Sequence, residues 1–339
     1  MASDAERCAA GAPNVLDTGG VLEGGACPHL QMIQYRAFKA MQWLVERLPR
    51  SLGYALAVMV ARLAYVFARK ARAKLERNLA MALPDLPPPA LHRLAWRNFR
   101  NHSKAYADLM RLPVARVEDL RQLLRIQGME HLEAARARGR GVLVVSAHMG
   151  SWEVAAAIWS ATVAPVSLFA EELEPRELYE WYRGTRARLG ISVLPLTRAG
   201  LRQVLQALDN QEMVVTAIDR DIMGTGITVD FFGRPARIPD GPAAIALRKG
   251  TPLLPVAVFR LPDDTFQAYG YPPVFADSTG DRDADVRRIT GELVGRLEDM
   301  IRAHPDQWHV PHPIWPEGAA LASGPREAHL THTHMDGSH

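Results

Sequence analysis

The stretch "GVLVVSAHMGSWEVAAA" at residues 141–157 contains an apolar run followed by residues typical of a turn and a helix start. Val142 to Val145 form an uninterrupted apolar, β-branched run, which predicts a strand buried on both faces. Gly150 permits a tight bend, and Ser151 is of the residue type that caps helices. The stretch therefore predicts a strand, a turn and a helix, with His148 just beyond the carboxyl end of the strand and Glu153 in the first helical turn.

The same alternation continues along the chain from about residue 120. Apolar runs recur as "APVSLFA", "ISVLPL", "MVVTAID", "ITVDFF", "LLPVAVFR" and "FQAYGY", with stretches of helical spacing between most of them. Apolar strands separated by helices predict an α/β fold with a mainly parallel central sheet flanked by helices. Ligands of such sheets bind at the carboxyl ends of the strands, where His148 is expected.

The N-terminal third has a different character. Residues 31–112 read as mostly helical, with a break at "LPDLPPPALH" from which the helix should resume at Ala90. Residues 31–80 hold ten Lys or Arg and two Glu, whereas the whole chain has a formal net charge of +3. Residues 51–68 are apolar apart from Arg62, but are marginal in length for a span, which needs about 20 residues.

Aromatic and basic residues flank this short apolar segment. The pattern favours a region that lies in, or dips into, the interface of an anionic bilayer. The alternative is a set of ordinary amphipathic helices packed on the domain. We expect four regions: a disordered N-terminus (1–30), a helical membrane-associating region (31–112), an α/β catalytic domain (113–320) and a disordered tail (321–339).

Two further features bear on the compartment. Cys8 and Cys27 lie in a Gly- and Ala-rich beginning and indicate no disulfide framework, which favours a reducing environment. The first residues lack the pattern of a secretory signal, so the catalytic part is expected in the cytoplasm. The closing "HLTHTHMDGSH" is interpreted as a solvated tail rather than a metal site.

His148 and Glu153 suggest general-base chemistry. A carboxylate bonded to one imidazole nitrogen fixes the tautomer and leaves the other nitrogen to take a proton from a nucleophile. The simpler interpretation is a polar histidine at the edge of the core and a glutamate that complements the helix dipole. A zinc site is not indicated, because the pair is not H-E-x-x-H and has no third ligand at suitable spacing.

Other motifs limit the chemistry further. The sequence has no G-x-S-x-G, no G-x-x-x-x-G-K-[ST] and no G-x-G-x-x-G after a strand. Transfer through an enzyme serine or cysteine is therefore not expected. Arg234 and Arg237 in "FFGRPARIPDGPA" precede a predicted helix start and could grip phosphate, although solvation on a loop is the alternative. Asp240 fits a helix cap better than a catalytic role.

Four motifs in order, from about residue 31 to 316, resemble the bacterial lipid A biosynthesis acyltransferase family, particularly its phosphatidylinositol mannoside acyltransferases. They are "AHMGSWE"; "YRGTRARLG"; "IDRD" followed by "GITVDFFGRPARIPDGPAAIALRKGTPLLPV"; and "HPDQWHVPHPIWP". The resemblance implies a glycerolipid acyltransferase-like fold. It also implies transfer of a fatty acyl group from acyl-CoA or acyl-carrier protein to a hydroxyl of a membrane glycolipid.

The resemblance also assigns roles to residues. His148 would deprotonate the acceptor hydroxyl and Glu153 would orient His148. Asp219 matches a position that often carries glutamate, and its shorter side chain makes direct contact with the imidazole doubtful. Arg186 matches an arginine that helps to hold phosphate or developing charge, and Arg220 belongs to the same "DR" motif as Asp219.

Several alternatives stay open at this stage. The acceptor is expected to be a phosphatidylinositol mannoside, with a lipid A precursor as the second choice. A thioesterase using the same dyad with water, or a non-catalytic membrane or nucleic-acid binder, would be different classes of protein. No cofactor, metal or nucleic-acid partner is expected, because the basic stretch lacks the pattern of base-reading modules. The resemblance places the protein on the cytoplasmic face of the bacterial inner membrane, as a peripheral or monotopic enzyme.

Overall fold

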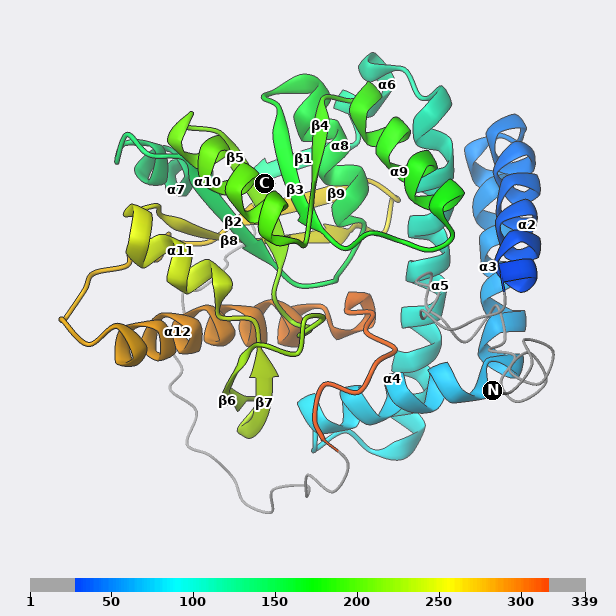
Figure 1. The fold of residues 1–339 in the computed structure, drawn as a ribbon. Helices are drawn as coiled ribbons and strands as arrows, with labels where there is room; N and C mark the ends of the chain where they lie inside the picture. Colours follow the sequence, from blue (N-terminus) through cyan, green and yellow to red (C-terminus); the bar gives the residue numbers. More distant parts are fainter. Residues whose placement is uncertain (1–27, 317–339) are drawn as a thin grey trace, which may run out of the picture.

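The computed structural model describes residues 28–316 (Figure 1). Cys8, Cys27, the histidine-rich end and the predicted tail at 321–339 lie outside the described residues, as does the predicted disordered N-terminus except for its last three positions. Those three positions are helical, because the first described helix already begins at Pro28.

A seven-stranded sheet forms the centre of the fold, in the order β1-β9-β8-β2-β5-β3-β4. Strands β8, β2, β5, β3 and β4 all run parallel to one another. Strand β9 runs antiparallel to β8, and β1 runs parallel to β9. The sheet strands are β1 (Leu124–Gln127), β2 (Val142–Ser146), β3 (Val166–Ala170), β4 (Ile191–Pro195), β5 (Met213–Ala217), β8 (Leu253–Arg260) and β9 (Phe266–Gly270). The predicted α/β class with a mainly parallel sheet is confirmed.

One predicted strand lies outside this sheet. The run "ITVDFF" forms β6 (Ile227–Phe231), which pairs antiparallel with β7 (Arg234–Ile238) in a separate hairpin. The two residues between these strands, Phe232 and Gly233, have φ angles of 50° and 74°. Positive φ at both central positions matches the right-handed twist of a hairpin, so the chain folds back at once instead of crossing to the main sheet.

Helices cover both faces of the sheet. They are α6 (Val117–Arg121), α7 (Met129–Arg136), α8 (Trp152–Thr162), α9 (Arg176–Arg188), α10 (Arg198–Asp209), α11 (Gly241–Lys249) and α12 (Arg282–Ala303). Val142 and Val144 of β2 belong to the cluster under α7, α8 and α9, and Leu143 and Val145 belong to the one under α10, α11 and α12. Successive side chains of a strand face opposite ways, so a strand buried on both sides must be apolar throughout.

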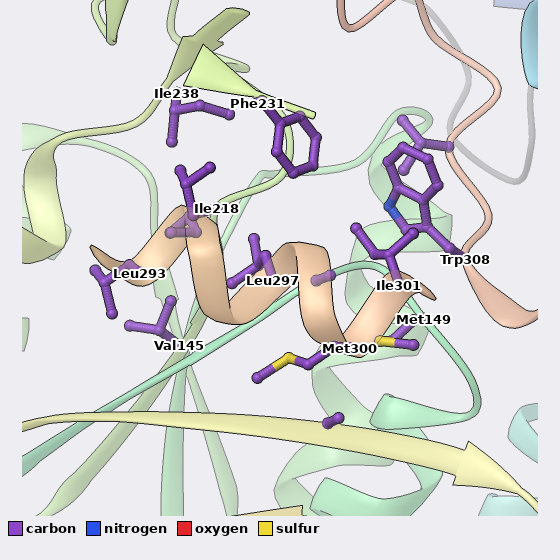
Figure 2. Close-up of a cluster of buried hydrophobic side chains, with 14 of the residues drawn as sticks. Val145, Met149, Ile218, Phe231, Ile238, Leu293, Leu297, Met300, Ile301 and Trp308 are labelled. Carbon is purple, nitrogen blue, oxygen red and sulfur yellow. The ribbon is translucent and has the colours of Figure 1, made fainter. Parts of the chain in front are cut away.

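The core beneath α12 holds the loops that follow β2 and β5. Figure 2 shows Leu293, Leu297, Met300 and Ile301 of α12 near Val145, Met149, Ile218, Phe231, Ile238 and Trp308. Met149 is 1% exposed and Ile218 is fully buried. These two residues are the direct neighbours of His148 and Asp219, so close packing fixes the backbone on which both polar side chains stand.

Four helices precede the sheet. They are α2 (Pro28–Arg47), α3 (Arg50–Phe67), α4 (Arg69–Ala82) and α5 (Pro88–Arg111), after which the 3-10 turn η1 (Leu112–Val114) leads to α6. The prediction that helix resumes at Ala90 is wrong by two residues, because Pro88 and Pro89 occupy the first turn of α5. A proline is tolerated there, since the amide hydrogens of the first turn have no partner within the helix.

Helix α3 has two distinct faces. Its buried residues are small apart from Tyr54, namely Gly53, Ala57, Ala61 and Ala64, and this face packs on α5. Large apolar side chains on its other face are exposed: Leu52, Met59, Leu63, Val66 and Phe67. Among the described residues, α3 is the one helix whose length and apolar composition would be sufficient to cross a membrane.

A buried ionic network ties the helical region to the sheet. Arg260, at the end of β8, pairs with Asp108 of α5 and donates to Tyr54 of α3 at 3.2 Å and to Ser151 Oγ at 2.8 Å. Tyr54 in turn donates to Asp108 at 2.7 Å. Because a buried charge is costly without its partner, this network fixes α3 and α5 against the loop that carries Ser151.

We expect Asp108→Asn to lower the free energy of unfolding by about 3 kcal/mol, because it removes the buried counter-charge of Arg260 and leaves only the longer pair with Asp264 at 3.4 Å. Chemical denaturation measures this change. Asp299→Asn is the control, since it removes a carboxylate from an exposed pair with Arg302, and should cost less than about 0.5 kcal/mol. Equal effects of the two substitutions would contradict the structural role of the buried network.

Candidate active site

Strand register brings His148 and Asp219 together. Strands β2 and β5 are parallel neighbours, and Ser146 pairs with Ala217 at their carboxyl ends. His148 and Asp219 each lie two residues beyond this pair, so they emerge side by side at the edge of the sheet. The expectation that His148 stands at the end of its strand is correct.

The Asp219 carboxylate accepts three hydrogen bonds. His148 Nδ1 lies 2.7 Å from Oδ1, while the His148 backbone N–H and the Trp308 indole N–H each donate to Oδ2 at 2.9 Å. With Nδ1 donating to the carboxylate, Nε2 of the neutral ring is left as an acceptor. Asp219 is fully buried, whereas the His148 side chain is 32% exposed. The arrangement presents an oriented imidazole at the surface of a cavity.

The charges of this pair stabilise each other. Burial lowers the pKa of His148, but the Asp219 charge and hydrogen bond outweigh it, so the pKa lies above its ordinary value of 6.5. Burial raises the pKa of Asp219, but the His148 charge and the hydrogen bonds from His148 and Trp308 outweigh it, so this pKa lies below 3.8. The carboxylate therefore stays ionised, and the imidazole is a stronger base than a free histidine.

A segment near the C-terminus packs against His148 and Asp219. It begins at the 3-10 turn η2 (Pro305–Gln307) and continues to residue 316. The His309 N–H donates to the His148 carbonyl at 3.0 Å, and the Gly150 N–H donates to the Gln307 carbonyl at 2.8 Å. Gly150 has a φ of 60°, and an added Cβ would lie 2.0 Å from the Val258 carbonyl oxygen. The tight bend predicted at Gly150 is confirmed, and no larger residue fits there.

The prediction that Glu153 orients His148 is wrong in this geometry. Glu153 forms its ion pair with Arg186 of α9, and Asp219 occupies Nδ1 of the imidazole. The doubt about a direct Asp219 contact is likewise overturned, because residues that follow paired strand ends are close enough for a short side chain to reach. Ser151 precedes α8, but its hydroxyl accepts from Arg260 and does not cap the helix.

Glu153 and Arg186 form a second polar group beside the first. The Arg186 guanidinium lies 4.9 Å from the centre of the Tyr182 ring. Burial is the largest cause that raises the pKa of both Tyr106 and Tyr182, and the Glu153 charge adds to it. These two phenols therefore stay neutral and protonated. Glu153 holds Arg186 in place at the cavity wall.

A cavity of about 630 Å³ opens in front of both groups. His148, Glu153, Arg186 and Arg220 line it, together with an apolar wall drawn largely from β3, α10, α11 and the loop after β5. Representative apolar residues are Leu168, Leu201, Val204, Ile222 and Ile245. The volume lies within the range of small-molecule sites, which are mostly apolar with a few convergent polar groups.

Two of the predicted phosphate-binding arginines are not at this cavity. Arg234 is 4% exposed and donates to the Met81 carbonyl, which joins the β6-β7 hairpin to α4. Arg237 donates to the Gly224 and Gly226 carbonyls and pairs with Asp221, which stiffens the loop before β6. Asp240 lines the cavity but makes no capping hydrogen bond with its side chain. The predicted helix did form after these residues, but the hairpin turns both arginines away from the cavity.

Several residues of the site were not identified from the sequence. Trp308 and His309 lie in "HPDQWHVPHPIWP", a motif recognised only as a resemblance. His309 stacks on His102 at 3.5 Å, and its Nδ1 lies 2.5 Å from Asn98 Oδ1. Burial, reinforced by neighbouring histidines, lowers the pKa of His309 well below 6.5, so it is neutral. Between residues 28 and 316, no three His, Cys, Asp or Glu side chains are grouped so as to hold a metal.

Comparisons with known proteins agree with the motif order. The family model for bacterial lipid A biosynthesis acyltransferase matches residues 25–317. The phosphatidylinositol mannoside acyltransferase of Mycobacterium tuberculosis (strain CDC 1551 / Oshkosh) is 35% identical over 249 residues, covering 71% of this chain and 76% of the relative. The lipid A biosynthesis lauroyltransferase of Escherichia coli (strain K12) is 27% identical over 237 residues, covering 68% and 76%.

The solved structure of the 1-acyl-sn-glycerophosphate acyltransferase PlsC from Thermotoga maritima is also similar to this chain. It covers 75% of this chain and 98% of that chain, with 16% identity and a TM-score of 0.37. The α/β fold class is therefore established by the strand order of this chain and not by this likeness. The sequence comparisons are decisive for the family: a match over residues 25–317, together with relatives of 35% identity, means that this chain belongs to the bacterial lipid A biosynthesis acyltransferase family and is an acyltransferase.

Proposed function

We propose that the protein transfers a fatty acyl group from an acyl thioester to a hydroxyl of a membrane glycolipid, with His148 as general base. The observation that carries this proposal is the imidazole held by a buried carboxylate at the wall of a largely apolar cavity. Nε2 of His148 has no protein partner within residues 28–316, so it is available to a substrate hydroxyl.

The reaction then follows from the geometry. His148 Nε2 takes the proton of the acceptor hydroxyl while the oxygen attacks the thioester carbonyl carbon. Asp219 keeps the ring in the productive tautomer and stabilises the imidazolium. When the tetrahedral intermediate collapses, the carbon–sulfur bond breaks, and the thiol leaves with the proton that His148 returns. The Arg186 cation, positioned by Glu153, is placed to stabilise negative charge that develops in the cavity.

The acceptor in this proposal is a phosphatidylinositol mannoside. The relatives with that name are 35% identical in M. tuberculosis and 30% identical in Mycolicibacterium smegmatis, whereas the E. coli lauroyltransferase is 27% identical. The test supplies purified protein with labelled palmitoyl-CoA or palmitoyl-carrier protein and a panel of lipids that includes phosphatidylinositol mannosides and lipid A precursors. Acylation confined to lipid A precursors would overturn the acceptor, and release of free palmitate alone would indicate a thioesterase.

We expect His148→Ala to lower kcat/KM for acyl transfer by about 100- to 10,000-fold, the range of a general base. Asp219→Asn should fall in the same range, because an amide does not hold the imidazole in the same tautomer and charge state. Steady-state transfer assays measure both, and near-ultraviolet circular dichroism checks that the fold is retained. A folded His148→Ala variant with wild-type activity would contradict the mechanism.

The pH profile distinguishes the two carboxylates. A general base is lost when it protonates, so activity should fall as pH drops through the raised pKa of His148, placing the acid limb of kcat/KM above 6.5. In Asp219→Asn the limb should move about one pH unit lower, because burial remains and the counter-charge is gone. Glu153→Gln should move the limb less than Asp219→Asn does. A larger shift from Glu153→Gln would restore Glu153 as the partner of the imidazole.

We also propose that α2 and α3 bind the interface of an anionic membrane on the cytoplasmic side. The support is the exposed apolar face of α3, with Phe67 61% exposed, and Trp43 of α2, 56% exposed. Basic residues surround these side chains, and such helices bind anionic lipid through both apolar burial and charge.

Vesicle binding tests this placement. Trp43→Ser combined with Phe67→Ser should weaken sedimentation with vesicles of phosphatidylglycerol and phosphatidylcholine by about 10-fold, since each loses an inserted aromatic side chain. Val163→Ser is the control, because Val163 is 51% exposed and follows α8 in the α/β domain. Loss of binding in the control alone would place the membrane contact elsewhere.

A further inference from the structure

A cationic cluster lies at the rim of the cavity beside the His148 site. Arg220 and His312 line the cavity, and Lys74 of α4 is close enough for its charge to act on His312. Three segments far apart in sequence therefore contribute one basic group each: α4, the loop after β5 and the C-terminal segment.

Hydrogen bonds fix the position of α4 next to the C-terminal segment. The Asn78 side-chain amide donates to the carbonyls of Val310 and His312 at 2.8 and 2.7 Å. Lys74 is four residues before Asn78, so both lie on the same face of α4. In Figure 1 the C-terminal segment, drawn in orange, passes close to α4. The docking through Asn78 thus brings the Lys74 stem toward His312.

The charge of Arg220 is not balanced by the carboxylates next to it in sequence. Asp219 is held by His148 and Trp308, and Asp221 accepts from the Gly226 N–H and pairs with Arg237. Arg220 itself has no protein partner within the described residues. A guanidinium placed at a cavity wall without a counter-charge suits an anionic ligand.

His312 reflects the excess of positive charge at this rim. Burial lowers the pKa of His312, and the charges of Arg220, Lys74 and His148 lower it further, to about 4. The His312 imidazole is therefore neutral at pH 7, and the positive charge of the cluster comes from Arg220 and Lys74. An anion bound at this rim would be attracted by the charges of Arg220 and Lys74 beside the neutral imidazole.

We propose that Lys74, Arg220 and His312 form a phosphate-binding site, and that its ligand is the phosphodiester of a phospholipid-linked acceptor. This inference rests on the proposed function. A phosphate held there would anchor the acceptor beside His148, so that a hydroxyl of its sugar head group reaches Nε2. The same chemistry would fit a phosphate of the thioester donor, and the experiment separates the two sources.

Lys74→Gln is the main variant, because Lys74 lies outside the cavity wall that holds His148. With phosphatidylinositol mannoside as acceptor, KM for the acceptor should rise about 10- to 100-fold, the effect of losing one charged contact to phosphate. The kcat and the KM for palmitoyl-CoA should stay near wild type. With an alkyl mannoside, an acceptor without phosphate, the variant should match the wild type.

Two further variants keep the result interpretable. Arg69→Gln removes an exposed charge from the same helix on a different face, and should leave the acceptor KM unchanged. Lys74→Arg should restore much of the affinity, and thermal unfolding shows whether each variant is folded. If Lys74→Gln does not fold, Lys74→Arg and His312→Gln are compared on the two acceptors in its place.

The outcomes are distinct. A wild-type enzyme that acylates neither acceptor would refute the proposed function itself. An active enzyme in which Lys74→Gln affects both acceptors equally, or neither, would overturn the phosphate site. A rise in KM for palmitoyl-CoA with an unchanged acceptor KM would assign the cluster to the donor and overturn the acceptor assignment.

Discussion

The site depends on one buried carboxylate. Asp219 is fully buried and ionised, and three donors from His148 and Trp308 satisfy it. Burying a carboxylate without such partners would be very costly, so the sheet, the loop after β2 and the C-terminal segment must come together for the fold to be stable. The hydrogen bond from His148 Nδ1 that helps to stabilise the buried Asp219 carboxylate thus also orients the imidazole.

Much of the fold could be predicted from the sequence because strand burial leaves a direct signal. A strand covered on both faces must be apolar at every position, as Val142 to Val145 are, and the helix between two such strands follows from its spacing. The hairpin of β6 and β7 was not predictable in this way, because the same apolar run fits either a central strand or a hairpin. The positive φ at Phe232, which decides between them, has no reliable signature outside glycine.

The site was predicted only in part for a related reason. Proximity along the chain suggested Glu153 as the partner of His148, yet the actual partner is 71 residues away and is selected by the pairing of Ser146 with Ala217. Sequence spacing indicates which residues are neighbours within one helix or strand. The order of strands in the sheet decides which residues of different strands are neighbours. Trp308 is a clearer case, since a tryptophan in a C-terminal loop gives no indication that it donates to a carboxylate after β5.

The helical region and the α/β domain are joined at points that matter for the site. Arg260 connects Tyr54 of α3 and Asp108 of α5 to Ser151, three residues after His148, while Asn78 of α4 holds the segment that supplies Trp308. Helix α3 ends at Phe67 with its apolar face exposed, and Lys74 lies in the second turn of the next helix, α4. An acceptor whose acyl chains remain in a bilayer at α3 would therefore have its head group within reach of the cavity. In the proposed membrane placement, the basic helix α4 would lie between an anionic surface and the His148 site.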